Sequence, residues 1–143
     1  MNEVEKKKRL KGIAKVVAKE IEVLNTIEQF KEDYKDSLIK ILLNPKDGKQ
    51  AALLVIENGS IYVEGIENNP KSSISKKALG WDGFMETKTK VFADILGGGD
   101  ISMGSIIWKV ITFRIKIKGI KNVLILMKLF EYEEDTIASN GIK

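Results

Sequence analysis

Apolar residues recur at helical spacing in the N-terminal part of the chain. They follow one another every three or four positions, with Lys and Glu between them, at Leu10, Ile13, Ala14, Val17, Ile21 and Leu24. This spacing gathers them on one side of a helix, so an amphipathic helix is predicted over residues 3–24. Thr26 and Gln29 have the spacing of a capping box, which predicts a second short helix beginning there.

Beyond Asp36 the pattern changes to short apolar runs separated by turn residues. The runs SLIKILL, AALLVIE and SIYVEGI are joined by NPKDGK and by Asn58-Gly59. Because Asn-Gly favours the tight type I′ turn, we predict three antiparallel strands in a meander. The run 51–56 is apolar at every position, which indicates a central strand covered on both faces. The sequence SSIS, at 72–75, predicts a brief further strand.

The second half of the chain predicts one more strand between helical segments. Asp82 is a suitable cap for a helix over 83–96, ended by the glycines 97–99, and residues 103–109 suggest one or two helical turns. Strict alternation over 111–118 predicts a strand with Ile and Phe on its core face and Thr, Arg and Lys on its wet face.

The segment after Gly119 predicts a helix beginning near Asn122 that is apolar around most of its circumference. Its apolar residues include the run 123–127, Leu129 and Phe130. Such a helix must be buried, or must cover something other than its own sheet. The segment 133–143 is acidic, then small and polar, and is expected to be a flexible tail.

Composition narrows the classes of function. The 143 residues suffice for one domain, and the chain has neither cysteine nor histidine. This excludes disulfides, thiolate nucleophiles, the usual zinc sites and the commonest general base, so we expect no enzyme, no metal and no cofactor. Only two of the 24 basic residues are Arg, and the second helix is acidic, so no nucleic acid is expected as a partner.

Two further features bear on location and on charge. No secretory signal is visible and the longest apolar run is far short of the roughly 20 residues that span a bilayer, so a cytoplasmic location is expected.

Two interpretations stay open for Lys76, Lys77 and the lysines of 111–118: a solvated face, or contact with acidic lipid headgroups or a coenzyme phosphate. The loop GGGDISMGS lacks the pattern of a phosphate loop, and the pairs Glu32/Asp33 and Glu133/Glu134 have surroundings in which nothing raises a pKa.

The helical segments of the second half carry more large apolar side chains than one face of a sheet can cover. Two interpretations are open, an ordinary core and an adaptable apolar cavity. The set consists of Trp81, Phe84, Met85, Phe92, Ile95, Leu96, Met103, Ile107, Trp108, Leu124, Met127 and Phe130.

The order of these elements resembles that of the sterol carrier protein (type two) domain. The strongest likeness is TFRIKIKGIKNVLILMKLF, residues 112–130, where a strand ends in a basic and apolar turn and runs into an apolar last helix. AALLVIENGSIYVEGIENNPKSSIS, residues 51–75, is similar more weakly. The chain departs from the family at 71–73, where an acidic residue is common, and at 111–112, where a Gly is common, which leaves the tunnel length and ligand open.

The resemblance implies an α+β fold with a five-stranded, mainly antiparallel sheet covered by helices, and a tunnel for a sterol, fatty acid, acyl-CoA or phospholipid. It implies no cofactor and no catalytic residue. We therefore expect an N-terminal amphipathic helix (1–24), a lipid-binding domain (25–132) and a tail (133–143). The expected function is binding or transfer of a lipid or fatty-acyl ligand, with transient contact to a membrane surface. The alternative is an interaction module in which the last helix forms a homodimer or binds another protein.

Overall fold

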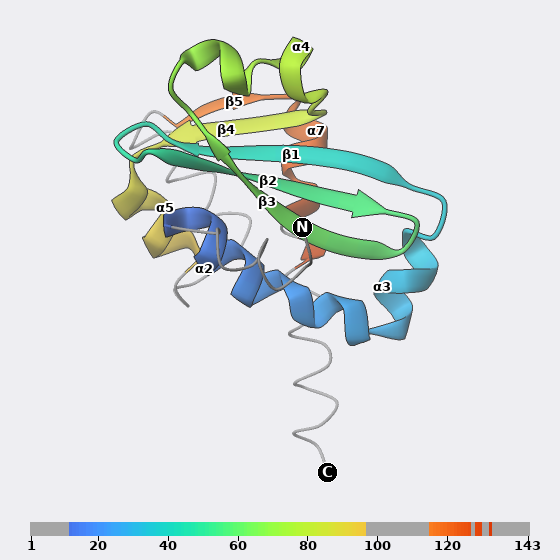
Figure 1. The fold of residues 1–143 in the computed structure, drawn as a ribbon. Coiled ribbons are helices and arrows are strands. Elements are labelled where there is room, and N and C mark those ends of the chain that lie inside the picture. Colours follow the sequence, from blue (N-terminus) through green and yellow to red (C-terminus); the bar gives the residue numbers. More distant parts are fainter. Residues whose placement is uncertain (1–11, 97–114, 127, 130–131, 133–143) are drawn as a thin grey trace, which may run out of the picture.

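A five-stranded sheet carrying helices on both faces forms the body of the protein (Figure 1). The computed structural model describes residues 12–96, 115–126, 128, 129 and 132, with the backbone alone for 93–96. The strands are β1 (Leu38–Pro45), β2 (Gln50–Glu57), β3 (Ser60–Glu67), β4 (Gly83–Thr87) and β5 (Lys116–Lys118). The helices are α2 (Gly12–Ile21), the 3-10 helix η1 (Glu22–Thr26), α3 (Glu28–Asp33), the 3-10 helix η2 (Lys71–Ile74), α4 (Lys76–Leu79), α5 (Thr89–Leu96) and α7 (Ile120–Val123).

The strand order is β3-β2-β1-β4-β5, and β1 pairs with β4 in parallel while the other three pairings are antiparallel. The predicted α+β class, with five mainly antiparallel strands, is therefore confirmed. The predicted meander is also confirmed, because β1, β2 and β3 are consecutive neighbours. Asn58 and Gly59 form its second turn with φ angles of 49° and 80°, as a type I′ hairpin requires.

Strand β2 lies between β1 and β3 and is buried on both faces, as its unbroken apolar run predicted. Side chains on one face join the larger core, formed with α2, η1, α3, α5, α7 and the helical residues after it. Side chains on the other face join a smaller core beneath η2 and α4. Figure 1 shows the same division, with α2, α3 and α5 on one side of the sheet and α4 on the other. None of the helices in the described ranges is both long and apolar enough to cross a bilayer.

The helix predicted over 83–96 is wrong in its first half, which is strand β4. Tertiary pairing decides the outcome, because β4 lies parallel to β1 with Phe84 opposite Leu42. Asp82 caps no helix; its backbone N–H donates to the Lys40 carbonyl at 2.7 Å and its carboxylate accepts from the Lys40 N–H at 2.9 Å. The helix begins only at Thr89.

Three smaller predictions also fail. SSIS forms no strand, because residues 71–74 make the 3-10 helix η2. Thr26 makes no capping box: its hydroxyl donates to the Val23 carbonyl at 2.6 Å, and the residue that precedes α3 is Ile27. The last helix begins at Ile120 after Gly119, whose φ of 64° suits glycine, and not near Asn122.

Two other predictions are met only in part. The α-helix predicted over 3–24 ends at Ile21, where the chain tightens into η1. Of the strand predicted over 111–118, the described residues are 115–118, with Ile115 buried and Lys116 and Lys118 exposed on the opposite face, as the alternation requires.

Candidate functional site

The sheet separates the apolar residues that the sequence grouped together. Phe84 and Met85 are neighbours on β4, so they point to opposite faces. Trp81 and Phe84 belong to the smaller core beneath η2 and α4, whereas Met85 and Phe92 belong to the larger core. These four side chains therefore do not line one common cavity.

The other members of the set belong to α5, to the C-terminal helix (α7 with the described helical residues that follow it), or to the residues that the structure does not describe. Ile95 and Leu96 lie in α5, where the backbone alone is described. Leu124 is half-buried in the C-terminal helix. Five members lie outside the described residues: Met103, Ile107, Trp108, Met127 and Phe130.

The C-terminal helix has apolar side chains on two of its sides. Val123 and Leu129 are buried in the larger core. Ile120 is 57% exposed, and Leu124, one helical turn further on, is half-buried and belongs to neither core cluster. Because residues four apart share a helix face, Ile120 and Leu124 form a partly exposed apolar surface, called here the outer ridge.

A cleft of about 510 Å³ lies on the opposite face of the sheet, beside η2 and α4. Its apolar floor is made by Trp81 and Phe84, whose ring centroids are 5.2 Å apart. The Trp81 indole N–H donates to the Ile74 carbonyl at 3.0 Å, which fixes the ring against η2. The residues that line the cleft are Lys71, Ile74, Ser75, Lys76, Trp81, Asp82, Phe84, Glu86, Lys116, Lys118 and Gly119.

Lysine ammonium groups lie over both aromatic rings of this floor. Lys76 Nζ is 5.8 Å from the centre of the Trp81 ring, and Lys116 Nζ is 6.0 Å from that of Phe84. At these distances a cation is attracted to the negative face of a ring. The sequence placed Lys76 and Lys116 on exposed surfaces, but it gave no indication that the two meet across one cleft.

A polar network behind the cleft was not predicted. Asn44, on β1, is only 5% exposed, and its amide nitrogen donates to Glu86 Oε2 at 2.8 Å. Its amide oxygen accepts from Asn68 Nδ2 at 2.9 Å. The network satisfies a buried amide and holds the Glu86 carboxylate toward β1. One asparagine at the end of the apolar run SLIKILLN was the available indication.

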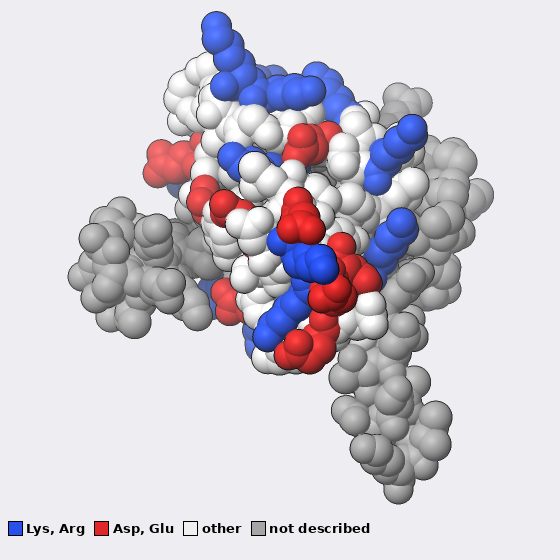
Figure 2. All heavy atoms as spheres, turned by 90° about the vertical axis from the view of Figure 1, so that its right-hand side faces the viewer, with Lys and Arg blue, Asp and Glu red and all other residues white. Residues whose placement is uncertain are grey.

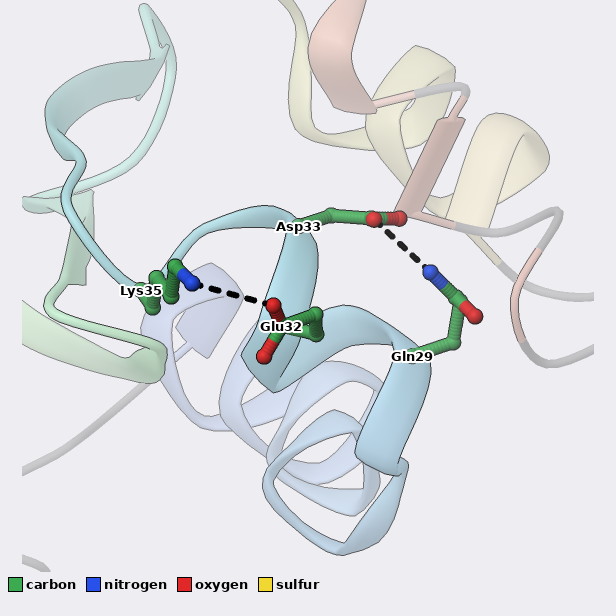
Figure 3. A network of polar contacts seen from close by, with 4 residues as sticks. All are labelled: Gln29, Glu32, Asp33 and Lys35. Carbon is green, nitrogen blue, oxygen red and sulfur yellow. Dashed lines mark hydrogen bonds and ion pairs between the residues drawn. The ribbon is translucent and has the colours of Figure 1, made fainter.

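Glu32 and Asp33 are exposed side chains at the end of α3. Glu32 accepts a 3.0 Å bond from Lys35, and Asp33 accepts a 2.8 Å bond from Gln29 (Figure 3). The Tyr132 hydroxyl also donates to Asp33, and the hydrogen bonds from Tyr132 and then Gln29 lower the Asp33 pKa from its ordinary value of 3.8. A general acid at neutral pH needs the opposite shift.

The described residues contain no candidate metal centre, and the pKa of Tyr34 is not lowered as it would be in a catalytic tyrosine. Within them, no group of three or more Asp, Glu, His or Cys side chains has an arrangement that could hold a metal ion. Burial, followed by the charge of Asp33, raises the Tyr34 pKa above 10.0, which keeps this hydroxyl protonated at neutral pH. Within the described residues, the outer ridge and the cleft are surfaces that could contact a ligand.

Comparison with known proteins bears on the fold. No protein-family model matches the chain, and no curated protein sequence matches it. Among solved structures, the chain is similar to one described as "UbiJ-SCP2 Ubiquinone synthesis protein". The two share 11% sequence identity with a TM-score of 0.53, over 82% of this chain and 84% of the other. At this identity the likeness concerns fold alone, and it confirms the fold implied by the sequence resemblance: the chain has the fold of the sterol carrier protein (type two) domain.

Proposed function

We propose that this protein binds an apolar, lipid-like ligand without catalysing a reaction on it, and that the outer ridge of the C-terminal helix forms part of the binding surface. The observation that carries the proposal is the apolar surface of Ile120 and Leu124, which lies outside both cores. The fold supports it, since one protein of this fold is described as serving the synthesis of ubiquinone, which is itself a lipid. Ligand classes that fit are a fatty acid, an acyl-CoA, a sterol and a phospholipid.

The size of the outer ridge limits what it contributes alone. Fully burying one Leu or Ile side chain is worth roughly 1.5–3 kcal/mol, but Ile120 is 57% exposed and Leu124 is half-buried already, so the two residues supply about 2 kcal/mol. Micromolar affinity needs about 8 kcal/mol. The ligand must therefore contact further apolar surface, and affinity should increase with the length of its hydrocarbon part.

Displacement of a fluorescent fatty acid tests the proposal. Leu124→Ser removes apolar surface from the outer ridge, and we expect about tenfold weaker binding, equal to a loss of about 1.4 kcal/mol. Lys121→Ser is the matched control, because it makes the same product residue at an exposed position of the same helix. Equal affinity of wild type and Leu124→Ser, or no binding of any fatty acid, acyl-CoA or sterol by the wild type, would contradict the proposal.

A second function is favoured by the same exposed residue. An isoleucine that is 57% exposed suits a protein interface as well as a lipid, so we propose homodimerisation through the outer ridge as the alternative. Light scattering distinguishes the two. A wild-type dimer that becomes monomeric in Leu124→Glu supports the interface, whereas a monomer that loses lipid in Leu124→Ser supports the ligand. A cytoplasmic location and contact with a membrane surface stay predictions.

A further inference from the structure

The cleft beside η2 and α4 carries a surplus of positive charge from two walls. Lys71 and Lys76 come from the η2 and α4 side, and Lys116 and Lys118 come from β5. In the part of the chain that the structure describes, none of these four ammonium groups has a carboxylate within 4 Å. Figure 2 shows lysine side chains gathered at the end of the molecule where α4 lies in Figure 1.

The two carboxylates of the cleft are held by other hydrogen-bond donors. Asp82 accepts from the Lys40 backbone N–H, and Glu86 accepts from the Asn44 amide. Four lysines against two carboxylates leave an excess of two positive charges around the opening. These lysines are therefore available to an anion from outside, and the anion that fits this charge best carries two negative charges or more.

The volume and the apolar floor of the cleft indicate the size and the chemical character of the rest of the ligand. About 510 Å³ lies within the range of small-molecule sites, roughly 300–1,000 Å³. One water molecule occupies about 30 Å³, and a phosphate group, with four oxygens, occupies only a few times that volume. The cleft therefore has room for more than a single phosphate group. Trp81 and Phe84, which are 7% and 6% exposed, give the floor an apolar centre between the lysines.

We propose that this cleft binds a phosphate-bearing ligand, with its phosphate oxygens between the lysines of the two walls and its organic part against Trp81 and Phe84. Lysine is a common phosphate ligand because its ammonium is a compact charge with three donors. A soluble phosphorylated compound and a phospholipid headgroup share this chemistry. The inference does not rest on the proposed lipid function, since Ile120 and Leu124 do not line the cleft.

Titration with inorganic pyrophosphate, followed by amide NMR shifts, tests the site. We expect the shifts to concentrate on residues 71–76 and 116–119 and to weaken as the ionic strength is raised. Lys71→Gln/Lys116→Gln removes one ammonium from each wall and should weaken binding by at least tenfold. Lys15→Gln/Lys19→Gln is the matched control, because it makes the same change of net charge at exposed positions of α2, on the other side of the sheet.

Sedimentation with vesicles distinguishes the two sources of phosphate. Vesicles of phosphatidylcholine with phosphatidylglycerol are compared with phosphatidylcholine alone. Binding to the anionic vesicles that is lost in the cleft variant assigns the headgroup, and pyrophosphate binding without vesicle binding assigns a soluble compound. Equal loss in the α2 control, shifts spread over the whole surface, or binding of neither probe would overturn the proposal.

Discussion

Asn25 joins the N-terminal helices to the edge of the sheet through two hydrogen bonds. Its Nδ2 donates to the Ile61 carbonyl at 2.9 Å, and its Oδ1 accepts from the Ile61 N–H at 2.8 Å. Since β3 is an edge strand of the sheet in the described residues, the Ile61 backbone groups that face away from β2 are paired by Asn25 instead of by another strand. Asn25→Ala leaves both groups without their partner, in a partly buried position.

The expected cost follows from the two bonds. A net 0.5–1.5 kcal/mol each predicts a loss of about 2 kcal/mol in the free energy of unfolding. For a domain of this size that loss lowers Tm by about 6 °C. Urea unfolding followed by circular dichroism measures it, with an unchanged m value as the sign that only stability has changed.

The neighbouring Thr26→Ala is the control for this measurement. Its hydroxyl makes one exposed bond, to the carbonyl three residues before it, and the expected loss is at most about 0.5 kcal/mol. If Asn25→Ala were as stable as Thr26→Ala, the bonds to Ile61 would have no net effect, and the account of how the N-terminal helices are fastened to β3 would be wrong.

Two further predictions concern stability. Gly119→Ala places a Cβ 2.1 Å from the Asp82 carbonyl oxygen at a φ of +64°, and should lower the free energy of unfolding in urea by at least about 3 kcal/mol. Gly80→Ala is the control, because its φ is +67° but the space around its Cβ is open, and it should cost about 1 kcal/mol. Equal costs would contradict the close packing of Gly119. Hydrogen bonds from the Thr89 N–H and then its hydroxyl lower the Asp47 pKa from its ordinary value of 3.8. A carboxyl group whose pKa is lowered in the folded state adds stability above pH 3.8, and this stability is lost as the pH falls through the folded-state pKa. The free energy of unfolding of the wild type in urea should therefore exceed that of Asp47→Asn at neutral pH, and the difference should shrink below pH 3.8. A difference that stays constant with pH would refute this role.

Local sequence patterns predicted the elements whose partners are close in the chain. The hairpin at Asn58-Gly59 and the buried strand β2 follow from turn chemistry and from an unbroken apolar run. Strand β4 was missed because it exists through pairing with β1, about forty residues earlier, and GFMET alone has no decisive periodicity. Because this short apolar segment directly precedes a longer helical one, its apolar residues were interpreted as part of the same helix, and the predicted helix began too early.

The candidate site was predicted less completely, for a geometric reason. The sequence shows which side chains are apolar, but it does not show on which face of the sheet each lies. Phe84 and Met85 were therefore grouped, although one belongs to the floor of the cleft and the other to the larger core. That Lys71 and Lys116 line the same cleft likewise depends on how η2 and β5 are placed in space.

Native mass spectrometry of the purified protein tests the central claim most directly. After incubation with a long-chain fatty acid, the account predicts a species heavier by one ligand, abundant in wild type and in Lys121→Ser and much reduced in Leu124→Ser. A wild-type spectrum that contains only the bare chain, with that fatty acid and likewise with an acyl-CoA, a sterol or a phospholipid, would contradict it.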